Sequence, residues 1–492
     1  MTSTGDVTTQ EQLIGGSWRP AADGSHFERT NPFTGEVVTL AAAGGRDDAR
    51  AAVEAAAAAF DTWAGMDPAE RTRLLEAAAD LLDERAPAIA GAMIEECGAM
   101  FGWGMFNCGL ASGMLRVAAG LSGLATKEGE TIPSEVPGLD ARAVRRPAGV
   151  VIAMAPWNAP VILATRAVAA PLALGNTVVL KASEKCPRVH AAVAGVLHDA
   201  GLPAGAINLV VHSTEGAPDV VDELIAHPAV RRVNFTGSTR VGRIIALKCA
   251  EHLKPSVLEL GGKAPMIVLD DADLDRSAAA ASFGAFMNAG QICMSTERII
   301  AEAAVAGPLA DKLAGRASKL VAGDPRDEGT MIGPLIDDAS RKHVLGLIED
   351  ARAKGARVLT GGEDLGGNVI TPAVVAGVTP QMRLYGEESF GPIVAIVEAV
   401  DTDDAVRIAN DSEYGLAAAV FTGDDQRGLA VAERVDSGIC HVNGSTVHDE
   451  PSMPFGGVKA SGWGRFGGTA ALAEFTELRW ITIQSGERHY PI

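Results

Sequence analysis

The sequence is poor in cysteine, in positive charge and in long hydrophobic runs, and each shortage excludes a class of protein. Six cysteines are scattered singly, without a C-x-x-C pair or clustered histidines, so we expect neither disulfides nor a metal site. Forty-two Lys and Arg stand against 62 Asp and Glu, and this net charge of −20 disfavours binding to nucleic acid. No run reaches the roughly 20 apolar residues that span a bilayer, and the polar start lacks the pattern of a signal peptide. We therefore expect a cytoplasmic protein that binds neither nucleic acid nor membrane.

The chain is long enough for more than one domain. Its 492 residues are 47% hydrophobic and 21% charged, which is more than one small core requires. Helical spacing of apolar residues occurs over 47–61, 69–100 and 108–124. The segment 129–138 has low propensity for regular structure and indicates an extended arm or hairpin between two larger units.

Short apolar runs alternate with amphipathic stretches in the rest of the chain. Runs that are apolar on both faces indicate strands buried in a parallel sheet, with helices on each side. This alternation predicts an α/β fold with two doubly wound units in tandem, the second beginning near residue 264. A run at 477–484 predicts a last strand that could join a neighbour's sheet. The first series of predicted strands comprises 149–155, 177–182, 206–211, 230–235 and 256–260.

Two strand ends carry turns that could bind a nucleotide at the carboxyl edge of an open sheet. At Gly237 and Ser238, small residues before a helix expose N–H groups that can hold a phosphate. At Lys181 and Glu184, a carboxylate could hold ribose hydroxyls. Each pattern alone is also typical of an ordinary turn or a solvated loop.

Three further residues could carry chemistry. Asn158 lies between two prolines that fix the backbone, which suits either a rigid hydrogen-bond donor or an Asx turn. Glu259 ends an apolar strand before two glycines and could be a general base or a solvent-exposed carboxylate. Cys293 lies in a polar, glycine-bearing turn, so it is the thiol best suited to attack an electrophilic carbonyl.

Six motifs occur in an order that resembles the aldehyde dehydrogenase superfamily. They are P-W-N-A-P, F-T-G-S-T, E-L-G-G-K, G-Q-I-C, E-E-S-F-G-P-I and P-F-G-G-V-K-A-S-G-W-G-R, and they cover residues 150–470 densely. The resemblance implies two doubly wound parallel-sheet domains, a β oligomerisation arm, and a homodimer or homotetramer. The implied division is an NAD-binding domain of 1–127 and 148–258, a catalytic domain of 259–442, an arm of 128–147 and 474–492, and a returning segment, 443–473, that closes the active site.

The same resemblance implies roles for the candidate residues. Cys293 is the nucleophile that forms a thiohemiacetal, whose oxyanion is held by the Asn158 amide and the Cys293 N–H while hydride leaves for the nicotinamide. Glu259 then activates the water that hydrolyses the thioester to a carboxylic acid. Glu184 favours NAD, because a 2′-phosphate would meet a like charge, while the nearby Lys181 leaves NADP open. The implied cofactor-binding residues are Trp157, Lys181, Ser183, Glu184, Gly237, Ser238, Gly261, Glu388 and Phe390.

Within the superfamily, four segments are similar to the salicylaldehyde, vanillin and benzaldehyde dehydrogenases, which implies an aromatic aldehyde as substrate. Arg166 lies about two helical turns after Asn158 and could bind a ring hydroxyl. The position also resembles an arginine of some succinate-semialdehyde dehydrogenases, so an aliphatic semialdehyde stays open, as does a salt bridge. Trp103, Phe106, Ile292, Met294 and Phe455 could wall a flat apolar pocket or belong to the core. The four segments are V-R-R-P-A-G-V-V, A-P-W-N-A-P-V-I-L, L-K-A-S-E-K-C-P-R and H-V-N-G-S-T-V-H-D-E-P-S-M-P-F-G-G.

Two positions depart from the family pattern. Ala167 and Phe466 stand where many relatives carry a lysine and a glutamate that are assigned to a proton relay. We therefore expect Glu259 to exchange its proton directly with bulk water. Two other functions also stay open: formation of an acyl-CoA, and binding of the cofactor without catalytic activity. The presence of Glu259 favours hydrolysis, and the intact set of Cys293, Glu259 and Asn158 favours activity.

Overall fold

Five parallel strands form the centre of the first sheet, and their apolar residues are buried on both faces, as the continuous hydrophobic runs predict. The computed structural model describes residues 7–124 and 129–492, so the first and last few residues of the predicted segment 1–127, and residue 128 of the arm, lie outside the described residues. In order across the sheet the strands are β12 (Ser256–Glu259), β11 (Val230–Thr236), β8 (Val150–Met154), β9 (Thr177–Lys181) and β10 (Ile207–Val210). Antiparallel strands from the two ends of the chain flank them: β22 (Gly462–Trp463) beside β12, and β2 (Gln12–Ile14) with β3 (Ser17–Arg19) beside β10.

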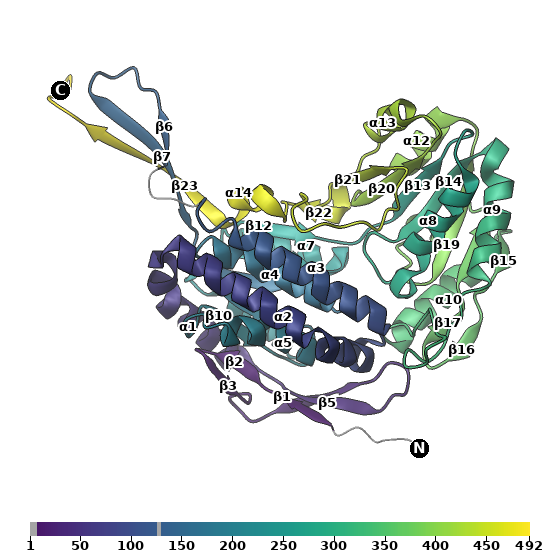
Figure 1. Ribbon diagram of the computed structural model, residues 1–492, viewed down its shortest axis with the longest axis horizontal. Coiled ribbons are helices and arrows are strands. Elements are labelled where there is room, and N and C mark those ends of the chain that lie inside the picture. The colour runs from purple at the N-terminus through teal and green to yellow at the C-terminus, as the bar shows by residue number, and fades with distance from the viewer. Residues whose placement is uncertain (1–6, 125–128) are drawn as a thin grey trace.

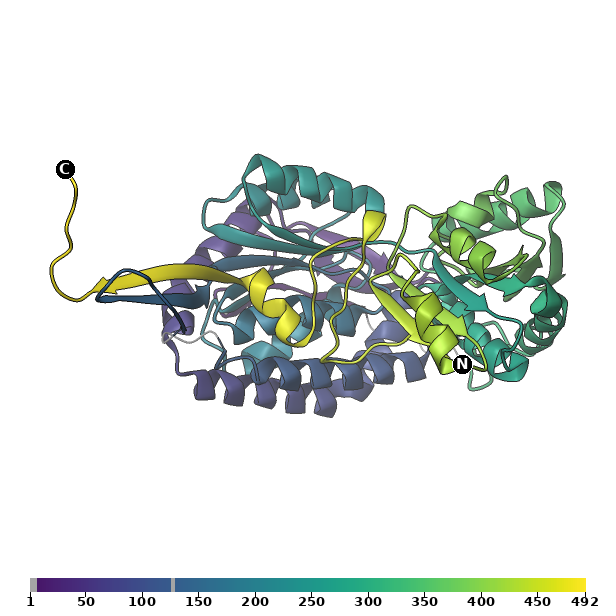
Figure 2. The ribbon, with the colours of Figure 1, turned by 90° about the horizontal axis from the view of Figure 1, so that it is seen from above.

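Helices cover both faces of this sheet (Figures 1 and 2). One hydrophobic core lies between the sheet and α2, α3, α4 and α5, and another lies between the sheet and α1, α6 and α7. The helices are α1 (Arg46–Gly65), α2 (Pro68–Cys97), α3 (Phe101–Ala119), α4 (Pro160–Ala173), α5 (Pro187–Asp199), α6 (Ala217–Ala226) and α7 (Thr239–Glu251).

Helix α3 begins at Phe101, earlier than the predicted start at residue 108, and it ends at Ala119. Glycines in its first turns lower the local helix propensity and hide the helix from sequence reasoning. One of them, Gly104, packs so closely on α2 that a Cβ would lie 2.7 Å from the Cβ of Ala90. The packing of two helices therefore overrides the local preference.

The second sheet repeats the doubly wound plan, which confirms the predicted α/β class with two parallel sheets. Six strands are parallel, and β15 pairs antiparallel at one edge. The order is β15 (Arg357–Thr360), β18 (Ala373–Ala376), β19 (Ile393–Ala399), β14 (Thr296–Glu302), β13 (Ala264–Val268), β20 (Ala417–Phe421) and β21 (Ile439–Val442). Its helices are α8 (Leu274–Phe286), α9 (Ala303–Ala317), α10 (Asp338–Ala353), α11 (Arg383–Gly386), α12 (Thr402–Asn410) and α13 (Asp425–Ala432).

Residues 8–42, to which the sequence analysis assigned no element, contain five short strands. Besides β2 and β3, they form a small separate sheet, and a further two-stranded pair lies in the second unit. These strands are too short, and mostly too mixed in burial, to produce a hydrophobic pattern. The separate sheet contains β1 (Thr8–Gln10), β5 (Val37–Ala42) and β4 (His26–Thr30), and the pair is β16 (Asp364–Gly366) with β17 (Val369–Ile370).

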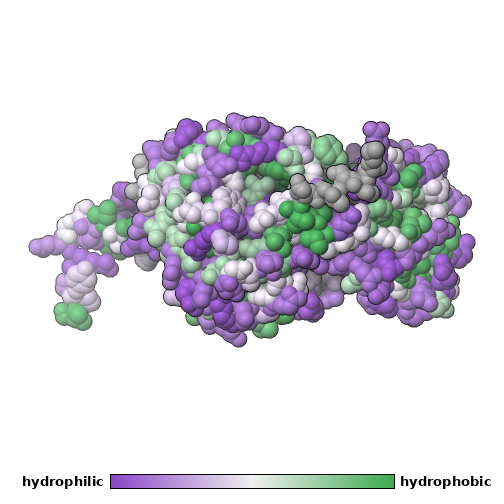
Figure 3. Space-filling view, turned by 90° about the horizontal axis from the view of Figure 1, so that it is seen from below, coloured by the Kyte–Doolittle hydropathy of each residue, from purple (hydrophilic) through white to green (hydrophobic). Residues whose placement is uncertain are grey.

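A three-stranded arm projects from the body (Figures 1 and 2). It consists of β6 (Glu130–Ile132), β7 (Leu139–Pro147) and β23 (Thr476–Gln484), which follows the short α14 (Ala471–Phe475). The predicted last strand is present, and it pairs antiparallel with β7 of its own chain along its whole length. The arm shows hydrophobic as well as hydrophilic surface (Figure 3), and Leu478, Trp480 and Ile483 are 61%, 72% and 51% exposed. Within the described residues, no helix combines the length and the apolar character needed to cross a membrane.

Candidate active site

The carboxyl ends of three neighbouring strands of the first sheet place candidate residues side by side. Trp157 and Asn158 follow β8, Gly237 and Ser238 follow β11, and Glu259 is the last residue of β12. β11 pairs with both β8 and β12. The chain winds outward from β8 in one direction and returns to β11 on its other side, and such a switch point is where open α/β sheets bind ligands.

The second sheet reaches the same place with its amino edge. Cys293 precedes β14, Glu388 and Phe390 precede β19, and these two strands are neighbours. A cavity of about 330 Å³ lies between the two sheet edges. Of the predicted site residues, the cavity brings together Trp157, Asn158, Gly237, Ser238, Glu259, Gly261, Cys293, Glu388 and Phe390.

The predicted adenosine-ribose residues lie on the same edge but outside this cavity. Lys181 ends β9, which pairs with β8, and Ser183 and Glu184 follow it. The backbone N–H of Ser183 donates to Nδ1 of the buried His190 at 3.0 Å. Burial raises the pKa of Glu184, but the charge of Lys181 and other contacts outweigh it, so the pKa is lowered and the carboxylate stays ionised.

A tight turn directs Cys293 toward the cavity. Asn288, Ala289 and Gly290 all have left-handed backbone, with φ of 51°, 55° and 72°. Left-handed backbone is costly for residues with a side chain and is concentrated at functional sites. At Gly290 a Cβ would lie 2.0 Å from the carbonyl oxygen of Gly391, so only glycine fits there.

Asn158 connects the first sheet to this turn. Its side-chain Nδ2 donates to the backbone carbonyl of Gln291 at 3.0 Å. The backbone carbonyl of Asn158 accepts from Nε1 of Trp103 at 3.1 Å and from Nδ2 of Asn288 at 3.0 Å. A side-chain amide carries two N–H donors. One N–H of the Asn158 amide is therefore free to bind a ligand, and the hydrogen bond of the other N–H fixes the position of the amide.

Glu259 and Cys293 are both desolvated in this cavity. Glu259 is 2% exposed, and among the described residues neither carboxylate oxygen has a hydrogen-bond partner. Burial raises the pKa of Glu259 well above its usual range, against a smaller lowering by Arg166 and Arg465. Burial, with the charge of Glu259, also raises the pKa of the Cys293 thiol to about 12. The free thiol is thus protonated, and a buried carboxylate without a partner stands ready to take up a proton.

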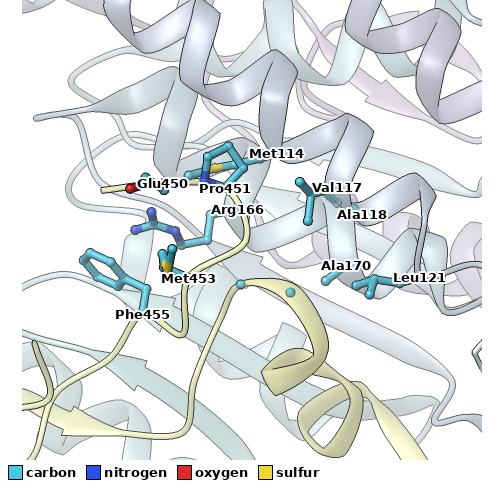
Figure 4. A pocket seen from close by; sticks show the side chains of 13 residues that line it. Met114, Val117, Ala118, Leu121, Arg166, Ala170, Glu450, Pro451, Met453 and Phe455 are labelled. Atoms are coloured by element: carbon cyan, nitrogen blue, oxygen red, sulfur yellow. The ribbon is translucent and has the colours of Figure 1, made fainter. Parts of the chain in front are cut away.

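Arg166 and Phe455 lie beside a second, smaller cavity of about 30 Å³. Arg166 projects from α4 and forms an ion pair with Asp449, a residue to which the sequence analysis gave no role. The guanidinium carbon lies 3.9 Å from the centre of the Phe455 ring. In Figure 4 the guanidinium lies between that ring and the segment that carries Glu450 and Pro451.

The other four predicted substrate residues line neither of these cavities. Trp103 is buried and bonds to Asn158, and Phe106 stacks on Trp103 at 5.4 Å while remaining half exposed. Ile292 and Met294, on either side of the thiol in sequence, are buried in the first hydrophobic core. These four side chains pack around the site and do not line either cavity.

A buried ion pair that sequence reasoning missed holds the loop before β19. Lys263 Nζ lies 2.5 Å from Glu297, whose carboxylate accepts from the backbone N–H groups of Ser389 at 2.8 Å and Phe390 at 3.0 Å. Phe390 has left-handed backbone, with φ of 46°, next to Glu388. The sequence feature that could have revealed this pair is the presence of two charged residues, Lys263 beside an apolar strand and Glu297 within one. They needed a partner, because an unpaired charge inside a protein is costly.

The cavity fits a dinucleotide. It contains the turn before α7, where Ser238 caps the helix, and the Glu388 carboxylate, which accepts from the Gly262 N–H at 2.8 Å. A Cβ at Gly237 would lie 2.5 Å from the Phe235 ring, so this turn tolerates no side chain. Exposed N–H groups suit a phosphate and a carboxylate suits ribose hydroxyls. In the described part of the chain, no group of three His, Cys, Asp or Glu is placed to hold a metal ion.

Comparison with known proteins gives consistent relatives. The model of the aldehyde dehydrogenase family matches residues 18–481. A vanillin dehydrogenase of Pseudomonas fluorescens is 54% identical over 98% of this chain and 99% of that protein. An NAD⁺ benzaldehyde dehydrogenase of Pseudomonas putida is 39% identical over 94% of each chain. The crystal structure of a salicylaldehyde dehydrogenase from Pseudomonas putida G7, complexed with salicylaldehyde, superposes with a TM-score of 0.96 at 42% identity, covering 99% of this chain and 100% of that one.

Proposed function

Because the chain belongs to the aldehyde dehydrogenase family, we propose that it oxidises aromatic aldehydes to carboxylic acids with NAD as the hydride acceptor. The observation that carries this proposal is the single cavity that contains a thiol, an amide donor and a partnerless carboxylate, at Cys293, Asn158 and Glu259. The aromatic substrate is supported by the vanillin, benzaldehyde and salicylaldehyde dehydrogenases among the relatives.

In the first half of the reaction, the sulfur of Cys293 attacks the carbonyl carbon of the aldehyde while its S–H proton passes to water in the cavity. The free N–H of the Asn158 amide and the Cys293 backbone N–H donate to the resulting oxyanion. An amide fixed by its other hydrogen bond loses little freedom when it binds this charge, which is the property of an effective oxyanion donor. The raised pKa of Cys293 keeps the sulfur protonated in the free enzyme and limits side reactions there.

The dinucleotide would be held by both sheets. Gly237 and Ser238 would hold its pyrophosphate, Glu388 its nicotinamide ribose, and Lys181 with Glu184 its adenosine ribose. The bound nicotinamide supplies the acceptor for the hydride that leaves the thiohemiacetal. Glu184, ionised beside Lys181, disfavours a 2′-phosphate and supports NAD over NADP.

In the second half, Glu259 activates the water that hydrolyses the thioester. Burial raises its pKa, which makes the carboxylate a stronger proton acceptor for this step. Ala167 and Phe466, at the positions where relatives carry a relay, are buried and apolar. We propose that the Glu259 proton leaves through the cavity itself.

A substrate panel tests the proposal. We expect purified protein to reduce NAD with vanillin, salicylaldehyde and benzaldehyde, and to do so less efficiently with NADP. The product is the free acid, and added coenzyme A leaves it unchanged. Absence of cofactor reduction with all three aldehydes would overturn the proposal, and formation of an acyl-CoA would overturn the hydrolytic step.

We also propose that the arm joins subunits into a homodimer or homotetramer. The edge strands β6 and β23 and the exposed apolar side chains of Leu478, Trp480 and Ile483 support this. Light scattering should show an oligomer that the substitution Trp480→Asp weakens. A monomer at micromolar concentration would contradict it.

A further inference from the structure

We infer that Asp449 is a specificity-determining residue: by neutralising Arg166 it makes the enzyme reject aldehydes that carry a carboxylate. The inference rests on the proposed oxidation of aromatic aldehydes and goes beyond it, because it states which substituents the site excludes. An arginine near the reacting thiol would ordinarily attract an anionic substrate. Here the cation already has its counter-ion in the protein.

The ion pair is buried and held from several sides. The Arg166 side chain is 6% exposed and that of Asp449 is 10% exposed. Arg166 is held on α4, and its guanidinium lies on the Phe455 ring. Asp449 comes from the segment between β21 and β22, 283 residues further along the chain. A pair enclosed to this degree keeps its geometry when a substrate arrives, because both side chains are held by the protein around them.

The pair lies close to the reaction. Leu163, one turn before Arg166 on α4, lines the cavity that contains Cys293. Phe455, whose ring contacts the guanidinium, precedes Gly456, where a Cβ would lie 2.8 Å from Oε1 of Glu259. An aldehyde whose carbonyl carbon is bonded to Cys293 therefore places its substituents within range of the pair. A carboxylate there gains little from a cation that is already neutralised, and it is repelled by Asp449.

A neutral hydroxyl group is treated differently. A guanidinium carries five N–H donors. Asp449 is the one hydrogen-bond acceptor that Arg166 has among the described residues. The remaining donors can bind a phenolic oxygen without any net charge being buried. The same side chain thus favours hydroxybenzaldehydes and excludes semialdehydes that end in a carboxylate.

The test compares each anionic aldehyde with its neutral methyl ester. The pairs are 4-carboxybenzaldehyde with methyl 4-formylbenzoate, and succinate semialdehyde with its methyl ester. The measured quantity is the kcat/KM of the anion divided by that of the ester. Both kcat/KM values are measured on the same preparation. An unfolded, inactive fraction lowers both equally and leaves their ratio unchanged. We expect the unchanged enzyme to prefer the ester in both pairs, and the substitution Asp449→Asn to shift the ratio toward the anion by about tenfold or more, since like charges close together cost several kcal/mol.

Three variants control the experiment. Asp403→Asn removes a carboxylate from an exposed ion pair with Arg434 and should leave the ratio within about twofold, as expected for an exposed pair. Asp449→Glu keeps the charge and should keep the preference for the ester. The double change Arg166→Gln with Asp449→Asn removes the freed cation and should abolish the shift.

The outcomes separate this inference from the proposed function. An unchanged enzyme that oxidises the anion as well as its ester, or an Asp449→Asn ratio within about twofold of the original, overturns the inference while leaving aromatic oxidation intact. Lack of turnover with every aldehyde overturns the proposed function instead. If Asp449→Asn folds but has no turnover, binding replaces kinetics. The dissociation constants of each anionic aldehyde and its methyl ester are then measured in the Cys293→Ala background and compared as a ratio. If it does not fold, Asp449→Ser takes its place.

Discussion

The two sheets contribute to the site through opposite edges. The first sheet supplies Asn158, Gly237 and Glu259 from the carboxyl ends of its strands, where doubly wound sheets generally bind ligands. The second sheet supplies Cys293 and Glu388 from loops that precede its strands. The proposed nucleophile and the proposed base therefore lie at the edges of different sheets, and the proposed reaction depends on the contact between these edges.

The two edges also differ in how their polar groups are held. Glu259, on the first sheet, has no hydrogen-bond partner among the described residues. On the second sheet, the loop that carries Glu388 is fixed by the buried pair of Lys263 and Glu297. This difference predicts that changes at Glu259 affect a chemical step, whereas changes to the pair that holds the Glu388 loop affect cofactor binding.

The largest effect is expected at the thiol. Cys293→Ala removes the only atom that bonds to the substrate, so kcat should fall by at least about 10³-fold, as when other covalent nucleophiles are removed. The dinucleotide contacts lie elsewhere in the cavity, and NAD affinity by calorimetry should stay within about threefold. Turnover that survives this change would contradict the proposed role of Cys293 as the nucleophile.

The next largest effect is expected at the base. Glu259→Gln should lower steady-state turnover by about 10²- to 10³-fold, the range for loss of a general base. Hydride transfer precedes hydrolysis, so rapid mixing should still show a burst of about one reduced cofactor per site, the kinetic sign of an accumulating acyl-enzyme. A variant without the burst would show that Glu259 is already needed when the thiol reacts.

The sequence predicted the first edge better than the second. The run that became β8 is apolar throughout and those of β11 and β12 are apolar in part. Their ends could be located, and Asn158, Gly237 and Glu259 were predicted there. Physical rules about strand ends gave no reason to look before a strand. Cys293 was found through its polar turn, and its role, like that of Glu388, came from the order of motifs.

The contacts that hold the site were beyond the sequence. Arg166 and Asp449 are 283 residues apart, and Lys263 precedes β13 whereas Glu297 lies on β14. Nothing local links such partners, because only the folded sheets bring them together. The predicted aromatic pocket stays a prediction for a similar reason: an aromatic or aliphatic side chain such as Ile292, which lies in the first hydrophobic core, fits a core as well as a pocket.

A smaller effect is expected from the buried pair on the second edge. Glu297→Gln leaves the Lys263 charge uncompensated, so the free energy of unfolding should fall by about 3–5 kcal/mol, as for one partner of a buried pair. The loop carrying Glu388 loosens, and the KM for NAD should rise about tenfold, an effect comparable to the loss of one hydrogen bond to a charged group. Thermal and chemical unfolding and the KM for both substrates measure these changes.

A double variant separates stability from cofactor binding. Replacing the pair with Lys263→Met and Glu297→Leu should recover much of the stability, because apolar residues can substitute for a buried pair. It cannot restore the acceptor for the Ser389 and Phe390 N–H groups, so the KM for NAD should stay raised. A double variant with normal KM would show that the pair serves stability alone. Asp275→Asn, in the exposed pair with Lys312, is the matched surface control.

The smallest effect is a pH dependence of NAD binding set by Glu388. Burial, with the nearby charge of Glu297, raises the pKa of Glu388 to about 7. An ionised carboxylate accepts stronger hydrogen bonds than a protonated carboxyl group, so NAD should bind fully above this pKa and more weakly as pH falls through it. From pH 8 to pH 6 the dissociation constant should rise up to about tenfold, since proton uptake then competes with binding. Calorimetry in the Cys293→Ala background measures it without turnover.

Two substitutions assign this dependence to the carboxyl group. Glu388→Gln should bind NAD weakly and equally across the same pH range, because the amide does not titrate. His343 contacts the backbone carbonyl of Glu388 at 2.9 Å and lines the same cavity, so its side chain is the matched control. His343→Asn should keep the dependence if Glu388 is its source. Loss of the dependence in the histidine variant would move the pH-sensitive group from the loop before β19 to α10, and the second edge would then bind cofactor through a different side chain from the one inferred.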